Sequence, residues 1–482
     1  MPFGLLSDSL SSLRSDLIEG CHFGILAISL DRGDTLLGLN PKDRFIPASN
    51  MKLFVTGAFL RQFGPQARGV TELAAAGKLG KKDGRIAEVK GDLVLRASGY
   101  PDVYQLLRPG SRGLLDSLAY LLHESGLRKF EGTVWVDGTL FAAEPYGPGW
   151  AVDDLVFSYG APLNAVLANG NAATLLATST PKGVVLSLDP PETPLRIVGR
   201  VSAAADPSTL PVLLISREPG SRTLHVGGRI ARGTTAKRQI SVPDPDSTAG
   251  LILLGAMRRA GIETRGKVAV VHPEGPAVAP GTILVRLESP PASEMISMVD
   301  AYSLNAETEA LLRHLDPAPS GKSAGPALRR LSAMLAETGV DTLDISFVDG
   351  SGLSPLNLAT ARSFVRWLES FDRDPTIGSI FRESLASPGA VGTLQKRFSE
   401  LAPGASLRSK TGTLTNVSAL SGYVTTAGGE RVVFSILSNG NRGSVAAGRA
   451  AEEAIVGMLS RSTRPAKPDT GTIAPPVRVV PR

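Results

Sequence analysis

The spacing of apolar and polar positions changes along the chain and predicts a different structure in each part. Residues 22–40, HFGILAISLDRGDTLLGLN, hold two apolar runs on either side of a D-R-G-D turn, so they predict a β-hairpin. The next apolar segment starts near Ser49 and has apolar residues over most of its helical surface, which predicts a buried helix. Gly64-Pro65 is expected to end this helix.

Residues 66 to about 287 have shorter apolar runs and predict a β-rich region. Four segments have the composition of strands, namely residues 91–99, 132–141, 222–230 and 268–272. The clearest helical spacing in this region covers residues 246–262. The part from about 165 to 240 is richest in short strands and turns, so we expect a small domain nested within a larger inserted one.

Helical spacing returns after residue 288, with predicted helices at 293–315 and 325–340. Three strand-like runs follow, SLRSKTGTL, VSALSGYVTT and ERVVFSILSNG, and a final helix is predicted at about 444–460. Because both ends of the chain combine strands with a helix, we expect them to form one α/β domain. The predicted division is a discontinuous domain at 1–65 and 288–460, an inserted domain at 66–164 and 241–287, a nested β-rich domain at 165–240, and a tail at 461–482.

Length and composition agree with several globular domains. The chain has 482 residues, 42% hydrophobic and 20% charged, and this length predicts about two or three domains. The net charge is +6, but charges of both signs are interspersed and aromatic residues make up only 5%, which argues against nucleic-acid binding. The basic, proline-rich tail has no periodicity and predicts a disordered extension.

Metal, cofactor and membrane functions find no support in the sequence. Cys21 is the single cysteine, the five histidines are scattered, and no H-E-x-x-H pattern occurs, so we expect no metal and no cofactor. No apolar run reaches the roughly 18 residues of a transmembrane helix. The N-terminal segment has no visible signal-peptide pattern, and Leu10, Leu13 and Leu17 instead predict an amphipathic helix.

Candidate chemistry begins with Ser49 and Lys52, an S-x-x-K pair at the start of the predicted buried helix. Residues three apart share one helix face, so the lysine amine can reach the serine hydroxyl. The positive end of the helix dipole and its free N–H groups would favour an alkoxide or oxyanion. Taken alone, the pair favours a helix cap with a surface lysine, and a second S-x-x-K, Ser179 to Lys182, lies in a turn-like stretch with an internal proline.

Two further motifs strengthen the catalytic interpretation. Ser303-Leu304-Asn305 is an S-x-N, and Lys410-Thr411-Gly412 is a K-T-G at the start of a predicted strand. Each is weak alone, but the ordered set S-x-x-K, S-x-N, K-T-G is typical of serine β-lactamases and penicillin-binding proteins.

The chain resembles the D-alanyl-D-alanine carboxypeptidase/endopeptidase family, the class C low-molecular-mass penicillin-binding proteins. The resemblance rests on the three motifs and on longer blocks that occur in the family's order: PASNMKL, GWAVDDLVFSYGAPLNAV, FVDGSGLSPLNLAT, GTLQKRF and SLRSKTGTLTNVSALSGYVTTAGGERVVFSIL. It implies an α/β (α+β) fold: a transpeptidase-like domain with an antiparallel sheet flanked by helices, plus large inserted β-rich domains.

The resemblance also implies a function and a set of site residues. It implies a serine DD-peptidase, carboxypeptidase and/or endopeptidase, that acts on peptidoglycan stem peptides outside the cytoplasm and is acylated by β-lactam antibiotics. Ser49 would be the nucleophile, Lys52 its base and Ser303 the proton relay to the leaving amine. The substrate-binding residues would be Asn305, Lys410, Thr411, Gly412, Thr413 and Asp154.

Lys52 can act as a base only if its amine is neutral. A shift from its ordinary pKa to ~7–8 needs roughly 4 kcal/mol. We expect burial in the apolar helix and the nearby charge of Lys410 to supply it. By the resemblance, the backbone N–H groups of Ser49 and Thr413 would form an oxyanion hole, and Gly412, which has no Cβ, would let the substrate approach.

Three positions depart from the family pattern or qualify it. Leu304 stands where relatives often have a polar residue, and Pro355 stands where several relatives have an arginine that binds a diaminopimelate side chain. Asp154, with Tyr159 nearby, matches the acidic partner of that arginine, but it is equally compatible with a turn residue. Arg362, seven residues beyond Pro355, is not expected to substitute.

Two other functions stay open. One is a β-lactamase or esterase of the same fold. A β-lactamase would need a deacylation base, and none of the four Leu-Asn pairs carries the glutamate of an E-x-x-L-N pattern. A binding protein without activity is the other alternative, although the polar positions of all three motifs are intact. The choice between carboxypeptidase and endopeptidase, the oligomeric state and the export route are not determined by the sequence.

Overall fold

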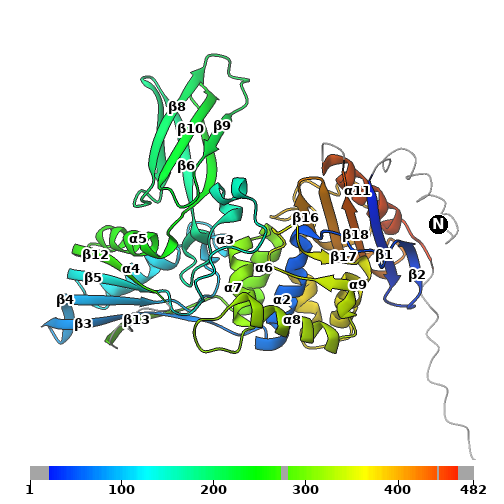
Figure 1. Cartoon of the computed structure of the whole chain (residues 1–482), viewed down its shortest axis with the longest axis horizontal. Helices are drawn as coiled ribbons and strands as arrows, with labels where there is room; N and C mark the ends of the chain where they lie inside the picture. Colours follow the sequence, from blue (N-terminus) through cyan, green and yellow to red (C-terminus); the bar gives the residue numbers. More distant parts are fainter. Residues whose placement is uncertain (1–20, 273–280, 442–444, 465–482) are drawn as a thin grey trace, which may run out of the picture.

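The computed structural model describes residues 21–272, 281–441 and 445–464, and it has a mixed α/β fold of antiparallel sheets flanked by helices (Figure 1). The predicted helix with Leu10, Leu13 and Leu17 lies outside the described residues, as does most of the predicted tail. Within the described ranges, no helix combines the length and apolar character needed to cross a membrane.

The first sheet joins the two ends of the chain. Among the described residues its strand order is β16-β17-β18-β1-β2, with every neighbouring pair antiparallel. The predicted hairpin is confirmed, and β1 pairs with β18 so that His22 lies opposite Asn439. The strands are β1 (His22–Ser29), β2 (Thr35–Leu39), β16 (Ser406–Leu414), β17 (Val417–Thr425) and β18 (Arg431–Asn439).

Helices cover both faces of this sheet because successive side chains of a strand point to opposite faces. Leu26 and Val433 pack into a core with α2 and α9, whereas Ala27 and Phe434 pack with α11 on the other face. In Figure 1, α11 and the group of α2, α6, α8 and α9 lie on opposite sides of the strands. The helices are α2 (Met51–Phe63), α6 (Ala292–Tyr302), α7 (Asn305–His314), α8 (Ala324–Glu337), α9 (Ala361–Asp372), α10 (Gly378–Ser384) and α11 (Val445–Ser460).

The segment between α2 and α6 forms separate sheets. In its described part, one sheet has the order β12-β5-β4-β3-β13, and α4 and α5 pack against its core. These elements are β3 (Val70–Lys82), β4 (Arg85–Arg96), α3 (Tyr104–Leu107), α4 (Leu114–Glu124), β5 (Lys129–Asp137), α5 (Pro245–Arg259), β12 (Glu263–Val271) and β13 (Thr282–Glu288). The predicted strands and helix of this region are thereby confirmed.

Two three-stranded sheets, β8-β10-β9 and β11-β6-β7, project at the top of Figure 1 and have a core of their own. Their strands are β6 (Ala172–Thr180), β7 (Gly183–Asp189), β8 (Arg196–Ala204), β9 (Val212–Ser216), β10 (Thr223–Ala231) and β11 (Thr235–Ser241). A short pair, β14 (Ile345–Ser346) and β15 (Leu358–Ala359), completes the strands. The exact domain boundaries stay predictions.

The prediction of one continuous helix at 293–315 is wrong, because two helices separated by a break occupy these residues. α6 ends at Tyr302, Ser303 has a left-handed backbone with φ of 60°, and α7 starts at Asn305. An S-x-N inside one straight helix would place Ser303 and Asn305 on different faces. The break instead turns Asn305 toward Lys52 on α2 and Ser303 toward Lys410 on β16, as their hydrogen bonds show. The helices α4 and α9 were not predicted.

Candidate active site

Ser49 lies in a 3-10 turn, Ala48–Asn50, that leads directly into α2. Ala48 has a left-handed φ of 46°, which turns the chain sharply before the serine. Lys52 is fully buried on the first turn of α2, and its Nζ donates to Ser49 Oγ at 3.0 Å. Glycine 64 ends α2 as predicted, with a φ of 78°.

The amine of Lys52 is held by two further acceptors. Its Nζ lies 2.6 Å from Oδ1 of Asn305 and 2.6 Å from the backbone oxygen of Ser351. Three contacts, to Ser49, Asn305 and Ser351, fix the amine at the head of the helix. A lysine with these fixed partners can exchange a proton with Ser49 without moving its chain.

Burial lowers the pKa of Lys52 to about 8 because a charged amine loses its hydration there. Buried carboxylates oppose this effect and raise the pKa, with Asp349 first, then Glu309 and Asp300. Burial is the main cause, as expected. The predicted charge effect between the two lysines falls on Lys410, whose pKa is lowered by burial first and by the charge of Lys52 second.

Ser303 and Lys410 form the second half of the site. Lys410 lies on β16, and its Nζ donates to Ser303 Oγ at 2.9 Å and to the backbone oxygen of Thr411 at 2.9 Å. Lys410 is fully buried, as Lys52 is. The left-handed backbone of Ser303 aims its hydroxyl at β16, which explains why the helix must break at this residue.

Asn305 connects the site to the inserted segment. Its Oδ1 accepts from Lys52, and its Nδ2 donates to the backbone oxygen of Tyr159 at 2.7 Å. Both ends of the amide are therefore engaged, which fixes its orientation. The S-x-N motif thus provides a hydrogen-bond partner for each lysine: Ser303 for Lys410 and Asn305 for Lys52.

The remaining K-T-G residues line the opening above Ser49. Ser49, Ser303, Thr411 and Thr413 line a common cavity of about 540 Å³. A Cβ on Gly412 would lie 2.7 Å from the backbone oxygen of Pro47, so the missing side chain lets β16 pack against the turn before Ser49. This contact is within the protein and is additional to the predicted approach of substrate.

Asp154 is joined to the site through Tyr159. It lies in the 3-10 turn Val152–Val156, and its carboxylate accepts from the hydroxyl of Tyr159 at 3.1 Å. The described residues that line the cavity of Ser49 do not include Asp154. Its proposed contact with substrate therefore stays a prediction.

Position 355 holds a proline, and Arg362 is engaged by acidic residues. Pro355 is exposed. Arg362 makes a bidentate ion pair with Asp344 at 2.7 Å and also pairs with Asp341 at 3.5 Å. As expected, Arg362 is not available in place of an arginine at position 355.

Several residues of the site were not predicted from the sequence. Glu309, on α7, accepts from the backbone N–H groups of Gly350 at 2.9 Å and Ser351 at 2.7 Å, and this holds the segment whose carbonyl contacts Lys52. Asp300, on α6, accepts from Ser384 at 3.0 Å. Such buried acids have no motif, so only their position beneath Lys52 identifies them.

Arg449 is another residue that the sequence did not single out. It lies on α11, lines the cavity of Ser49, and its Nη2 donates to Thr413 Oγ1 at 3.3 Å. Arg397 lines the same cavity, but it is held by Glu452 at 2.9 Å and Glu453 at 2.7 Å. Lys396 adds a third cation, so one side of the opening is positively charged.

The sequence matches the D-Ala-D-Ala carboxypeptidase 3 (S13) family over residues 6–462. The chain belongs to this family. It is a serine-type DD-peptidase of peptidoglycan, and the predicted resemblance, fold class and activity are confirmed.

Relatives of known name match this chain over most of its length. A D-alanyl-D-alanine carboxypeptidase from an Actinomadura species is 30% identical over 463 residues, which cover 90% of this chain and 82% of the relative. The carboxypeptidase DacB of Haemophilus influenzae is 26% identical over 445 residues, covering 90% and 88%. The crystal structure of penicillin-binding protein 4 from H. influenzae superposes with a TM-score of 0.76 at 24% identity, covering 94% of this chain and 99% of that one.

Proposed function

We propose that Ser49 attacks the carbonyl carbon of the penultimate D-alanine of a stem peptide and that Lys52 takes the hydroxyl proton. The observation that supports this most directly is the 3.0 Å contact between Lys52 Nζ and Ser49 Oγ at the head of a buried helix. The attack forms an ester bond to Ser49, breaks the peptide bond and releases the terminal D-alanine. Water then hydrolyses the ester and restores the serine.

The leaving amine needs a proton as the peptide bond breaks. We assign this transfer to Ser303, whose hydroxyl lies 2.9 Å from Lys410 Nζ. Lys410 in turn can return a proton to Ser303, since burial and the charge of Lys52 both lower its pKa. Asn305 would hold the substrate amide, because its side chain is already fixed between Lys52 and the backbone of Tyr159.

The terminal carboxylate of the substrate would bind at the positively charged side of the cavity. Thr411, Thr413 and Arg449 offer two hydroxyl groups and a guanidinium there. The substrate backbone would run beside β16, the edge strand of its sheet, and the N–H groups of Ser49 and Thr413 would hold the oxyanion. An oxyanion-hole donor of this type is worth about 3 kcal/mol in the transition state.

β-Lactam antibiotics would acylate the same serine. We infer slow release of the acyl group, because the chain lacks the glutamate of an E-x-x-L-N pattern. Intact-protein mass spectrometry after benzylpenicillin treatment tests this inference. A stable adduct on Ser49 is expected, whereas sustained hydrolysis of nitrocefin would favour a β-lactamase.

We propose carboxypeptidase activity as the main reaction, supported by the similarity to relatives named D-alanyl-D-alanine carboxypeptidase. The peptidoglycan substrate of the family supports a location outside the cytoplasm for this reaction. Incubation with defined muropeptides, followed by mass analysis, separates the two activities. Release of D-alanine from pentapeptides is expected, and cleavage of cross-linked dimers with no release of D-alanine would identify an endopeptidase instead.

A further inference from the structure

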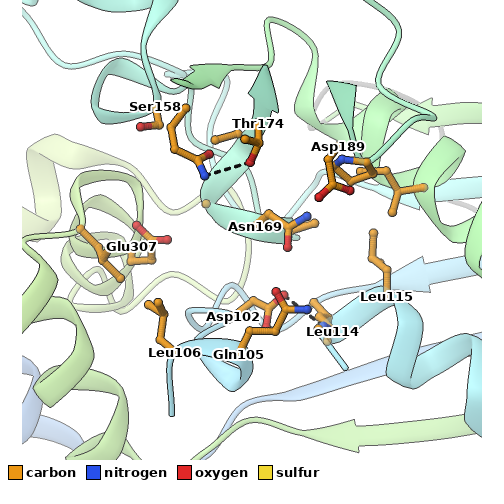
Figure 2. A pocket seen from close by; sticks show the side chains of 18 of the residues that line it. Asp102, Gln105, Leu106, Leu114, Leu115, Ser158, Asn169, Thr174, Asp189 and Glu307 are labelled. Atoms are coloured by element: carbon orange, nitrogen blue, oxygen red, sulfur yellow. Dashed lines mark hydrogen bonds between the residues drawn. The ribbon is translucent and has the colours of Figure 1, made fainter. Parts of the chain in front are cut away.

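A second cavity lies on the other side of the S-x-N motif. It has a volume of about 670 Å³ and extends from Ser303 and Asn305 to the inserted segment (Figure 2). Ser303 lines this cavity as well as the cavity of Ser49. A substrate that occupies both would therefore pass directly across the S-x-N motif.

One wall of the second cavity is a turn with a left-handed backbone. Asn169 and Gly170 line the cavity with φ of 52° and 61°, and Leu167 and Asn171 beside them have φ of 46° and 54°. Non-glycine residues rarely adopt this conformation, and such strain persists only where the surroundings impose it.

Hydrogen bonds made by Asn164 hold the turn in this conformation. Asn164 Oδ1 accepts from the backbone N–H of Leu167 at 3.0 Å and from Asn171 Nδ2 at 2.9 Å, while its Nδ2 donates to Asp246 at 2.8 Å. The network leaves the side chain of Asn169 exposed at the cavity wall. The protein thus maintains a strained turn that presents an amide to the cavity.

Opposite the turn lies a buried carboxylate. Glu307, on α7, is 5% exposed and lines the cavity, and Figure 2 shows it across from Asn169 and Asp102. Burial raises the pKa of this carboxyl group, and its own backbone N–H opposes that rise. A Cβ on Gly170 would lie 2.7 Å from Glu307 Oε1, so the glycine keeps the space around this carboxylate open.

The lining combines donors and acceptors with an apolar surface. Burial raises the pKa of Asp102 to about 6 and that of Glu307 to about 7, so Glu307 can donate as well as accept near neutral pH. Asp116 is neutralised by Arg259 at 3.0 Å. Three carboxamides face the same space, and so do several apolar side chains: Gln105, Asn169 and Gln239, with Leu106, Leu114, Leu115, Ile252, Pro190 and Pro191.

We propose that this cavity binds a saccharide, the N-acetylated disaccharide that carries the stem peptide. Hydroxyl and acetamido groups need mixed donors and acceptors instead of a single fixed charge, and the apolar wall suits the C–H face of a sugar ring. The volume is within the range of small-ligand sites. The inference rests on the proposed function, because it takes the ligand to be the glycan attached to the stem peptide that Ser49 attacks.

The test compares a D-Ala-D-Ala pentapeptide with the same peptide attached to the N-acetylglucosamine–N-acetylmuramic acid disaccharide, using the full chain. We expect the disaccharide to lower KM about tenfold, equivalent to about 1.4 kcal/mol. Asn169→Gly, which keeps the left-handed backbone accessible, and Gln239→Ala should each remove most of this difference. Neither should change KM for the free pentapeptide, and the exposed Gln66→Ala serves as the matched control.

Equal KM values for the two substrates in the wild-type protein would overturn the proposal, and so would a disaccharide effect that persists in both variants. If the wild-type protein hydrolyses neither substrate and penicillin does not acylate it, the proposed function itself fails. Saturation-transfer NMR with the free disaccharide then tests separately whether the cavity binds the saccharide. Transfer that is lost in Asn169→Gly supports the saccharide site, and no transfer in the wild-type protein overturns it.

Discussion

Lys52 on α2 and Asn305 on α7 are 253 residues apart in the chain, yet Lys52 Nζ lies 2.6 Å from Asn305 Oδ1. This contact links the S-x-x-K motif to the S-x-N motif directly. The same amine contacts Ser49, so any change in its protonation alters the proposed nucleophile and the Asn305 amide together.

The pH dependence of acylation should follow Lys52. Because its pKa is lowered to about 8, the neutral amine increases as pH rises through that value. The second-order rate of acylation by benzylpenicillin, measured by stopped flow, should therefore increase about tenfold per pH unit below pH 8 and level off above it. A rate that falls with rising pH over this range would contradict the assignment of Lys52 as the base.

Replacement of Lys52 should abolish acylation without unfolding the protein. Lys52→Ala removes the base, so no penicillin adduct should appear by intact mass, while circular dichroism should remain that of the wild-type protein. Lys182→Ala is the matched control, since it alters the second S-x-x-K, whose lysine is exposed in the turn after β6. Normal acylation of Lys52→Ala would refute the proposed mechanism.

Removal of the Ser303 hydroxyl should slow peptide hydrolysis. A positioned proton-transfer group typically contributes a factor of about 100 or more, and Ser303 is the hydroxyl that contacts Lys410 at 2.9 Å. We expect Ser303→Ala to lower kcat for pentapeptide by about this factor, measured by D-alanine release. Ser179→Ala should leave kcat unchanged, and an unaffected Ser303→Ala would exclude the relay.

Arg449 should bind the free carboxylate of the substrate. Charge-assisted hydrogen bonds contribute about 1.5–3 kcal/mol, so Arg449→Ala should raise KM for a D-Ala-D-Ala peptide roughly tenfold or more. The same peptide with an amidated C-terminus should show little change, because it has no charge to lose. Arg373→Ala, whose side chain is 74% exposed, is the control. An equal effect on acid and amide would indicate a structural role for Arg449.

Replacement of Glu309 should lower the stability of the folded protein. It is buried, pairs with Arg313 at 3.2 Å and accepts two backbone N–H groups. Glu309→Gln leaves a buried arginine partly unpaired, a change that typically costs about 3 kcal/mol or more, so the urea midpoint should fall clearly. Glu337→Gln removes an acid from an exposed pair with Arg330 and should change stability by less than about 0.5 kcal/mol. Equal midpoints for the two variants would contradict this prediction.

Much of the architecture could be predicted because it depends on local spacing. The two apolar runs and the turn in residues 22–40 predicted the hairpin, and Gly64 predicted the end of α2. The Ser49–Lys52 contact also follows from local geometry, since the two residues lie one helical turn apart. By contrast, the unbroken helical spacing of residues 293–315 concealed the break at Ser303, because the left-handed turn is stabilised by a contact with Lys410 that is 107 residues away.

The amino-acid sequence by itself determined the family, the order of the three motifs and the pairing of Ser49 with its base. Only the tertiary structure decided that Lys52 contacts Asn305 and that Lys410 contacts Ser303. It also decided which buried acids surround the two lysines. The physical reason is that spacing along a helix or strand is set by neighbouring residues, whereas burial and the pKa of an amine are set by every segment that packs around it.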